Sequence, residues 1–372
     1  MHYLDHNATT PLRAGALEAM VSGAASARNA MSLHHHGRKS RVTIDQARER
    51  LRTLLDFPKA EVVFTSGGTE ADNLAIVGFA SRAREDRGAN QILLSPWEHP
   101  AVTEPALNLE KSGFEVRYLP TTPQGTLDVE QARAMISPKV ALVAVMLAQN
   151  ETGLILDVAG IAALCHGAGV HLHCDAVQGV GKVTLSARLL GVDSLAITAH
   201  KFGGPRGIGA LLSMKGIRPP GLWKGGGQEE GTRSGTQPTP LVCGMEKALE
   251  LSIEDLDKYA KLRKNHDKFE ARLVDELGLG VIGAEVERLP NTTSVWVPAL
   301  KSGRWVETLS ERGFAISAGA ACHAGASGPS RIHQLVGQTD LAMEMLRVST
   351  GLETSEEALD DLCASMMTLL TH

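Results

Sequence analysis

The chain reads SLAITAHKFGGP from Ser194 to Pro205, an apolar run that ends in Thr-x-His-Lys and is followed by a Gly-Gly-Pro break. The short apolar run is typical of a buried strand, and the break predicts a turn directly after it. Lys201 is therefore expected at the end of a buried strand, beside the hydroxyl of Thr198 and the imidazole of His200.

Two other apolar runs upstream also end in residues that carry chemistry. Asp175 follows His171-Leu172-His173-Cys174, and Ser66-Gly67-Gly68-Thr69 follows the apolar segment 61–65. A lysine nucleophile, a carboxylate and a glycine-rich anion cradle are together what a protein contributes to pyridoxal-phosphate chemistry. Each feature alone has a simpler interpretation. The glycines could form only a tight turn with Thr69 as an N-cap, and Asp175 could be a helix cap or part of a structural ion pair.

Strand-like and helix-like segments alternate through the first two-thirds of the chain. Strands are expected at residues 61–65, 91–95, 116–119, 140–146 and 170–174, and helices at 69–87, 101–111, 128–136 and 158–168. This alternation predicts an α/β fold with a mostly parallel central sheet flanked by helices. Ligands of such sheets bind beyond the carboxyl ends of the strands, where all the motifs above lie.

The last third of the chain predicts a smaller C-terminal α+β domain. A glycine-rich loop covers residues 221–235, and a long helical stretch runs from Pro240 to about Leu277. Strands are expected at 292–297 and 345–349, and helices at 305–312 and 355–370. We therefore expect an N-terminal segment (1–15) that packs with the small domain, a large cofactor-binding domain (16–250) and the small domain itself (251–372).

Composition excludes several classes of protein. The net charge of −5 provides no basic excess for a nucleic-acid partner. The longest apolar run, residues 140–148, is shorter than the ~20 residues that a membrane helix needs, and no signal peptide is expected. The five cysteines form neither a CxxC pair nor a dense framework, which favours a reducing, cytoplasmic environment.

Four further residues are candidates for a site at the strand ends. His99 follows an apolar segment and could stack on a cofactor ring, and Gln178 could reach the cofactor's phenolic oxygen. Asn150 lies in an Asn-Glu-Thr-Gly sequence that supplies a donor or only makes a turn. Arg347 interrupts an apolar strand, where its guanidinium could clamp a substrate carboxylate or form a structural ion pair.

Cys322 differs from the other cysteines because it lies in a stretch of small residues, SAGAACHAGASGP, from Ser317 to Pro329. Such a stretch can bury little surface, whereas a structural cysteine belongs in a core. We interpret Cys322 as a reactive thiol that must move. The sequence His34-His35-His36 is interpreted as a polar loop near the site entrance, and no metal site is expected.

Taken in order, these motifs resemble the cysteine desulfurases, which belong to the class V aminotransferase group of fold-type I pyridoxal-phosphate enzymes. The resemblance runs nearly end to end. Its motifs are YLDHNATTP (3–11), SLH (32–34) with GR (37–38) after it, TSGGTE (65–70), EH (98–99), NETG (150–153), DAVQ (175–178), TAHK (198–201), GGQE (226–229), RSGT (233–236) and RVS (347–349).

The resemblance implies a role for each candidate residue. Lys201 would bind the cofactor as a Schiff base, Asp175 would pair with the pyridine nitrogen, Gln178 with the phenolic oxygen, and His99 would stack on the ring. The phosphate would be held by Gly68, Thr69, Thr198 and His200, and by Thr236 of the neighbouring subunit, which implies a homodimer. Asn150 and Arg347 would bind the substrate carboxylate, and Cys322 would accept the sulfur.

The implied activity is conversion of L-cysteine to L-alanine, with sulfur held on Cys322 as a persulfide and passed to a protein acceptor, for iron–sulfur cluster assembly or another sulfur-transfer pathway. Two departures keep alternatives open. The family's Asn-Pro-x-Ser is Asn29-Ala30-Met31-Ser32 here, and GAACH (319–323) also resembles selenocysteine lyases. A selenocysteine lyase or another β-lyase is therefore one alternative, and an inactive scaffold of an iron–sulfur assembly complex is another.

Overall fold

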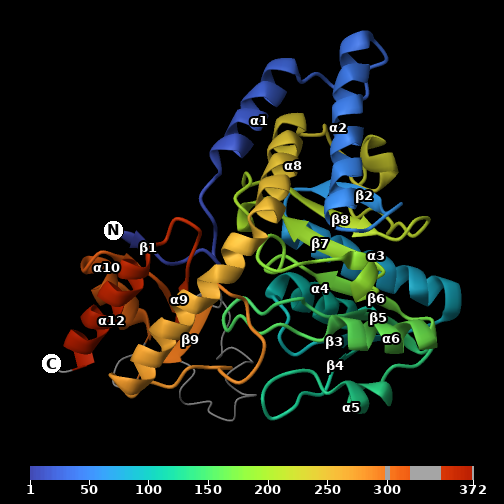
Figure 1. Cartoon of the computed structure of the whole chain (residues 1–372). Coiled ribbons are helices and arrows are strands. Elements are labelled where there is room, and N and C mark those ends of the chain that lie inside the picture. Colours follow the sequence, from blue (N-terminus) through green and yellow to red (C-terminus); the bar gives the residue numbers. More distant parts are fainter. Residues whose placement is uncertain (298–301, 319–344, 371–372) are drawn as a thin grey trace.

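A seven-stranded sheet forms the centre of the larger part of the molecule (Figure 1). The computed structural model describes residues 1–297, 302–318 and 345–370. The strand order is β2-β8-β7-β6-β5-β3-β4, and β8 alone is antiparallel to its neighbours. The strands are β2 (Glu61–Thr65), β3 (Gln91–Leu94), β4 (Glu115–Tyr118), β5 (Val140–Ala144), β6 (His171–Asp175), β7 (Ser194–Thr198) and β8 (Gly209–Ser213).

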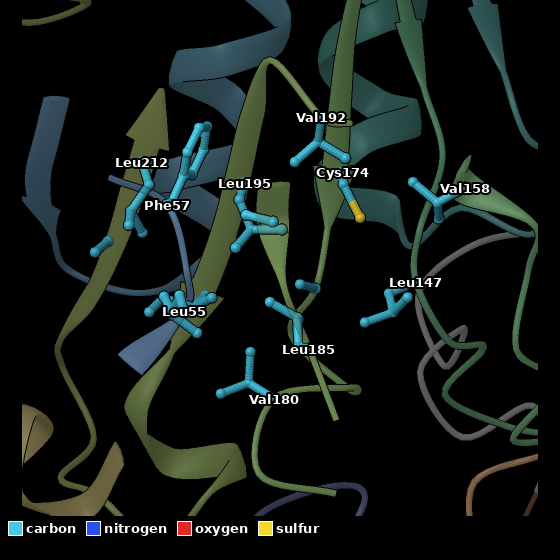
Figure 2. Close-up of a cluster of buried hydrophobic side chains, with 14 of the residues drawn as sticks. Leu55, Phe57, Leu147, Val158, Cys174, Val180, Leu185, Val192, Leu195 and Leu212 are labelled. Carbon is cyan, nitrogen blue, oxygen red and sulfur yellow. The ribbon is translucent and has the colours of Figure 1, made fainter. Parts of the chain in front are cut away.

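Helices cover both faces of this sheet. Successive residues of a strand point to opposite sides, so each strand contributes apolar side chains to both faces. In β2, Val62 and Phe64 belong to one apolar cluster and Val63 belongs to a second. The first cluster lies under α2 (His35–Leu54), α6 (Val158–Ala168) and α8 (Thr239–Glu254), and the second under α3 (Gly68–Arg87) and α4 (Pro100–Glu110). Figure 2 shows part of the first cluster, with Leu195 and Leu212 of neighbouring strands beside Leu55 and Phe57.

Local chemistry sets the ends of the helices that connect the strands. At the start of α6, the Asp157 side chain accepts a hydrogen bond from the Gly160 amide at 2.8 Å, as an N-cap does. At its end, Gly169 has a φ of +64°, a left-handed conformation that glycine adopts without strain. The remaining short elements of this part are α5 (Val129–Arg133), α7 (Ala187–Leu190) and the 3₁₀ turns η1 (Ala199–Lys201) and η2 (Gln228–Gly231).

A smaller antiparallel sheet lies in the C-terminal part of the chain, with the order β11-β12-β9. It packs with helices around a third apolar cluster that contains Trp305. The elements are α9 (Leu256–Asp275), β9 (Thr292–Trp296), α10 (Ser302–Glu311), β10 (Phe314–Ala315), β11 (Ser317–Ala318), β12 (Met345–Ser349) and α12 (Glu356–Leu370).

The N-terminal segment lies against this smaller part. Strand β1 (His2–Tyr3) pairs in parallel with β10, and Leu4 is fully buried in the third cluster. The chain then returns to the larger part, where α1 (Ala14–Ser26) packs along α8 (Figure 1). Helices α8 and α9 adjoin at Asp255, so together they connect the two parts. The segment around Asn7 consequently lies between the two sheets.

The structure confirms the predicted fold class. Most predicted elements are present within a few residues of their expected bounds, and β2 and α6 have the bounds that were expected. The antiparallel strand β8 and the helices α1 and α2 were not predicted. In the part of the chain that the structure describes, no helix has the length and apolarity needed to cross a membrane.

Candidate active site

One cavity opens at the carboxyl ends of the parallel strands, as the sheet topology predicts. Residues from β5, β6 and β7 or the loops after them line it, together with the start of α3 and Arg347 from the smaller sheet. The cavity brings together ten of the predicted site residues: Gly68, Thr69, His99, Asn150, Asp175, Gln178, Thr198, His200, Lys201 and Arg347.

Among the described residues, one predicted site residue is not part of this lining. Thr236 lies in the exposed segment that follows η2, which is compatible with a role in another subunit and adds nothing to the cavity of its own chain. Cys322 lies outside the described residues.

Lys201 ends the 3₁₀ turn that directly follows β7. Its Nζ donates hydrogen bonds to the main-chain oxygens of Asn7 and of Ala8, the latter at 3.1 Å. The ammonium of Lys201 is therefore placed at the cavity wall by the N-terminal segment as well as by its own strand.

Asp175 is the last residue of β6 and is 5% exposed. Its Oδ1 accepts a hydrogen bond from the Val177 amide at 2.9 Å. Burial, reinforced by the nearby Asp72 carboxyl, raises the pKa of Asp175 to about 8. A buried carboxylate of this kind is stabilised by a cationic partner, and a protonated ring nitrogen in the cavity would be one.

The start of α3 faces the same cavity through Gly68 and Thr69. A Cβ atom on Gly68 would lie 2.9 Å from Val177 Cγ2 and 3.6 Å from Thr198 Cβ, so a side chain would crowd this corner. The N-terminal amides and dipole of a 20-residue helix favour an anion. A basic lysine, a buried carboxylate and an anion cradle around one cavity fit pyridoxal phosphate.

Three of the other candidates have defined contacts. His99 is the N-cap of α4, where its Nδ1 accepts a hydrogen bond from the Ala101 amide at 3.1 Å. The Nε2 of Gln178 donates to the Asn7 carbonyl at 2.9 Å. Burial, together with the positive charges of Lys201 and Arg206, lowers the pKa of His200 to about 4, so its imidazole is neutral at pH 7.

Arg347 lies in β12 and is 3% exposed. Its Nη1 donates to the main-chain oxygen of Asn150 at 3.0 Å, and its Nη2 forms an ion pair with Asp5. The buried Nε has no hydrogen-bond partner within the described ranges. The ion-pair interpretation of Arg347 is therefore correct, and the arginine also faces the cavity, so the two interpretations are compatible.

Sequence analysis assigned no role to several buried polar residues of the site. The Oδ1 of Asp72, in α3, lies 3.1 Å from Nε2 of His173, in β6. Glu98 accepts hydrogen bonds from the Ser95 hydroxyl and, at 2.6 Å, from the Met146 amide. Burial raises the pKa of Asp72 and of Glu98 to about 8. The one available signal was an acidic residue within the apolar pattern of a predicted helix, as at Asp72.

The three consecutive histidines lie at the start of α2, so their interpretation as a loop is wrong. His34 is the N-cap of this helix, and its Nδ1 accepts a hydrogen bond from the Gly37 amide at 3.1 Å. Within the described residues, no group of three or more histidine, cysteine or acidic side chains is arranged to hold a metal ion.

Comparisons with known proteins agree with this geometry. The family model described as Aminotransferase class-V matches residues 2–362. The chain is 36% identical over 365 residues to the cysteine desulfurase IscS of Dictyoglomus turgidum, covering 96% of this chain and 91% of that protein. It is 39% identical over 334 residues to a cysteine desulfurase of Cereibacter sphaeroides, covering 89% and 85%.

The fold is also similar to that of a solved NifS-like protein, with a TM-score of 0.91, 31% sequence identity and full coverage of both chains. Fold, cavity and sequence thus lead to the same group of enzymes. The chain belongs to the class V aminotransferase family and, within it, to the pyridoxal-phosphate-dependent cysteine desulfurases.

Proposed function

We propose that this protein converts L-cysteine to L-alanine, retains the sulfur on Cys322 as a persulfide, and passes it to a protein acceptor. The main support for the proposal is that Lys201, Asp175, the start of α3 and Arg347 line the same cavity. The relatives named cysteine desulfurase support the same substrate.

The residues of the cavity divide into those that would hold the cofactor and those that would hold the substrate. Lys201 would bind the cofactor covalently, Asp175 would pair with its ring nitrogen, and His99 and Gln178 would contact the ring and its oxygen. Gly68, Thr69, Thr198 and His200 would hold the phosphate. When bound, pyridoxal phosphate withdraws electrons from the Cα of an amino acid.

Substrate orientation is assigned to Arg347 and Asn150. A guanidinium binds a carboxylate with parallel hydrogen bonds, and Arg347 is held in place by Asp5 and by the Asn150 carbonyl. We assign removal of the proton at the substrate Cα to Lys201 Nζ, because Lys201 is the lysine that lines the cavity in the described residues.

Cys322 is assigned the sulfur transfer. Its thiolate attacks the sulfur of the substrate, so a new S–S bond forms while the bond between that sulfur and Cβ breaks, and Cβ receives the electron pair. A proton then completes the methyl group of alanine. One cysteine and one enzyme thiol thereby become one alanine and one persulfide, with no external oxidant or reductant.

The assembly and the pathway belong to the proposal as well. Thr236 would complete the phosphate site of the neighbouring subunit in a homodimer, and the enzyme would act in the cytoplasm. The acceptor would be a scaffold or carrier protein, such as one that assembles iron–sulfur clusters.

The test is to quantify alanine and sulfide from L-cysteine in the presence of a thiol reductant, with selenocysteine as a parallel substrate. We expect equal molar yields of alanine and sulfide from cysteine with wild-type protein and with Lys215→Ala, which changes an exposed lysine, and none with Lys201→Ala. Turnover of selenocysteine without turnover of cysteine would overturn the proposal and favour the lyase alternative, which the comparisons do not support.

A further inference from the structure

A second lysine lies directly behind the wall of the cavity. Lys182 is 2% exposed and belongs to the turn after β6. Its Nζ donates hydrogen bonds to Gln178 Oε1 at 2.7 Å and to Asn7 Oδ1 at 2.8 Å. Both acceptor residues line the cavity, whereas Lys182 does not. A buried lysine is costly compared with an apolar residue of similar size, so its contacts call for an explanation.

The contacts of Lys182 fix the orientation of one amide side chain in the cavity wall. Nζ of Lys182 is the donor in both contacts, so it faces the oxygen of each amide. Gln178 therefore presents Oε1 to Lys182, and its Nε2 is directed to the Asn7 carbonyl at 2.9 Å.

The same argument applies to the second amide. Asn7 presents Oδ1 to Lys182, and its Nδ2 donates to Thr292 Oγ1 at 2.9 Å and to the Asn150 carbonyl at 3.3 Å. Lys182 thus fixes the orientation of two amide side chains whose residues line the cavity.

The network continues to the lysine that the proposed function places at the reaction centre. The main-chain oxygen of Asn7 accepts hydrogen bonds from both Gln178 Nε2 and Lys201 Nζ. Displacement of the Asn7 segment would therefore change an acceptor of Lys201. Burial and the positive charges of Lys201 and Arg347 lower the pKa of Lys182, which indicates that the two lysines also interact electrostatically.

We propose that Lys182 is a positioning residue, which holds the Gln178 amide and the Asn7 segment in the orientation that places Lys201 Nζ for its reaction. This inference rests on the proposed function for the identity of the reaction and on the geometry for the role of Lys182.

The test compares Lys182→Met, which keeps a side chain of similar length without donors, with Ser252→Ala as a matched control. Ser252 is buried against Gly181 in the same turn, but its hydroxyl donates to Leu249 within α8. The readouts are the visible absorption spectrum of the bound cofactor, the pH midpoint of that absorption, and kcat and KM for cysteine.

For Lys182→Met we expect a shifted spectrum and pH midpoint, and a kcat about tenfold or more below wild type with a smaller change in KM. Ser252→Ala should match wild type in all readouts. A Lys182→Met protein with wild-type spectrum, midpoint and kcat would overturn the inference. If Lys182→Met does not fold, Lys182→Gln, which retains a neutral donor, is measured in the same way and should show the spectral shift in weaker form.

The spectral readouts separate this inference from the proposed function. If wild-type protein binds the cofactor but makes no alanine from cysteine, the proposed function fails while the spectrum and its pH midpoint still test Lys182. If alanine forms and Lys182→Met is spectrally unchanged, only the inference about Lys182 fails.

Discussion

At the scale of single residues, the site combines acidic groups that burial holds partly protonated. Asp72, Glu98 and Asp175 each have a pKa raised to about 8, with burial as the main cause. Their carboxyl groups also repel one another as they ionise, as Asp175 and Asp72 do toward Glu98. A cationic cofactor ring beside Asp175 would stabilise its ionised carboxylate, so cofactor binding should increase the stability of the protein.

Glu98→Gln tests the effect of this cluster on stability. The ordinary pKa of this carboxyl is 4.5 and its value in the folded protein is about 8. The folded state therefore binds an extra proton between these pH values, and stability falls as pH rises through that window. Because the amide does not titrate, the unfolding free energy of the variant should fall less steeply with pH, by the equivalent of up to about one bound proton.

The measurement is the midpoint of thermal unfolding of cofactor-free protein from pH 5 to pH 8.5. Glu104→Gln, which changes an exposed carboxylate on α4, is the control and should follow wild type. Parallel curves for wild type and Glu98→Gln would contradict a raised pKa at Glu98.

At the scale of elements, three of the parallel strands each deliver one part of the site at their carboxyl ends. β7 leads to Lys201, β6 ends in Asp175, and β2 leads to Gly68 at the start of α3. These strands are buried on both faces, which produces apolar runs in the sequence and makes the residues that follow them conspicuous. For that reason these strands, and the gathering of the residues that follow them at one cavity, could be predicted from the sequence.

Other elements carry a weaker signal. Strand β8, with the sequence GALLS, follows β7 without an α-helix between them, so it does not fit the alternation of strand and helix from which the other strands were predicted. The contacts of Asp72 with His173 and of Lys182 with Asn7 form only after folding, when α3 packs on β6 and the turn after β6 meets the N-terminal segment. Contacts of this kind depend on tertiary structure, which no local pattern encodes.

Gly68→Ala tests the role of the α3 start as an anion cradle. The added Cβ would lie 2.9 Å from Val177 Cγ2, which forces the corner of the cavity to shift. We expect the affinity for pyridoxal phosphate to fall by about tenfold, equivalent to about 1.4 kcal/mol of binding free energy. The measurement is a titration of cofactor-free protein with pyridoxal phosphate.

The matched control is Gly167→Ala in α6, where an added Cβ has no neighbour within 4 Å in the described structure. This variant should bind cofactor as wild type does, and should be more stable by up to about 1 kcal/mol because alanine favours the helix. Equal cofactor affinity in Gly68→Ala and wild type would contradict the cradle.

At the scale of the whole molecule, the site is built between the two sheets. The large sheet and its loops supply most of the cavity lining, and the small sheet supplies Arg347. The N-terminal segment passes between the two sheets, with Asn7 bound to both Gln178 and Thr292. The expected domain boundaries at residues 15 and 250 stay predictions, as does the contribution of Thr236 to a neighbouring subunit.

Mixing two impaired variants tests that contribution. If Thr236 acts in the neighbouring subunit, a heterodimer of Lys201→Ala and Thr236→Ala contains one site with both wild-type residues and one with neither. Activity should therefore rise to as much as about half of the wild-type value per dimer when the impaired variants are unfolded and refolded together. The measurement is alanine formation from cysteine, and a mixture with only the average activity of the two separate variants would contradict a shared site.

The central claim is that sulfur passes from cysteine to Cys322. The most direct measurement is a single turnover with isotopically labelled cysteine, followed by mass analysis of the peptide that contains Cys322. For wild type and for Cys243→Ala, which changes a half-buried cysteine of α8, we predict that this peptide gains one labelled sulfur atom for each alanine formed. Cys322→Ala should form no alanine from cysteine. Alanine formation by Cys322→Ala at the wild-type rate, or labelled sulfur on another cysteine of the wild-type protein, would contradict the account.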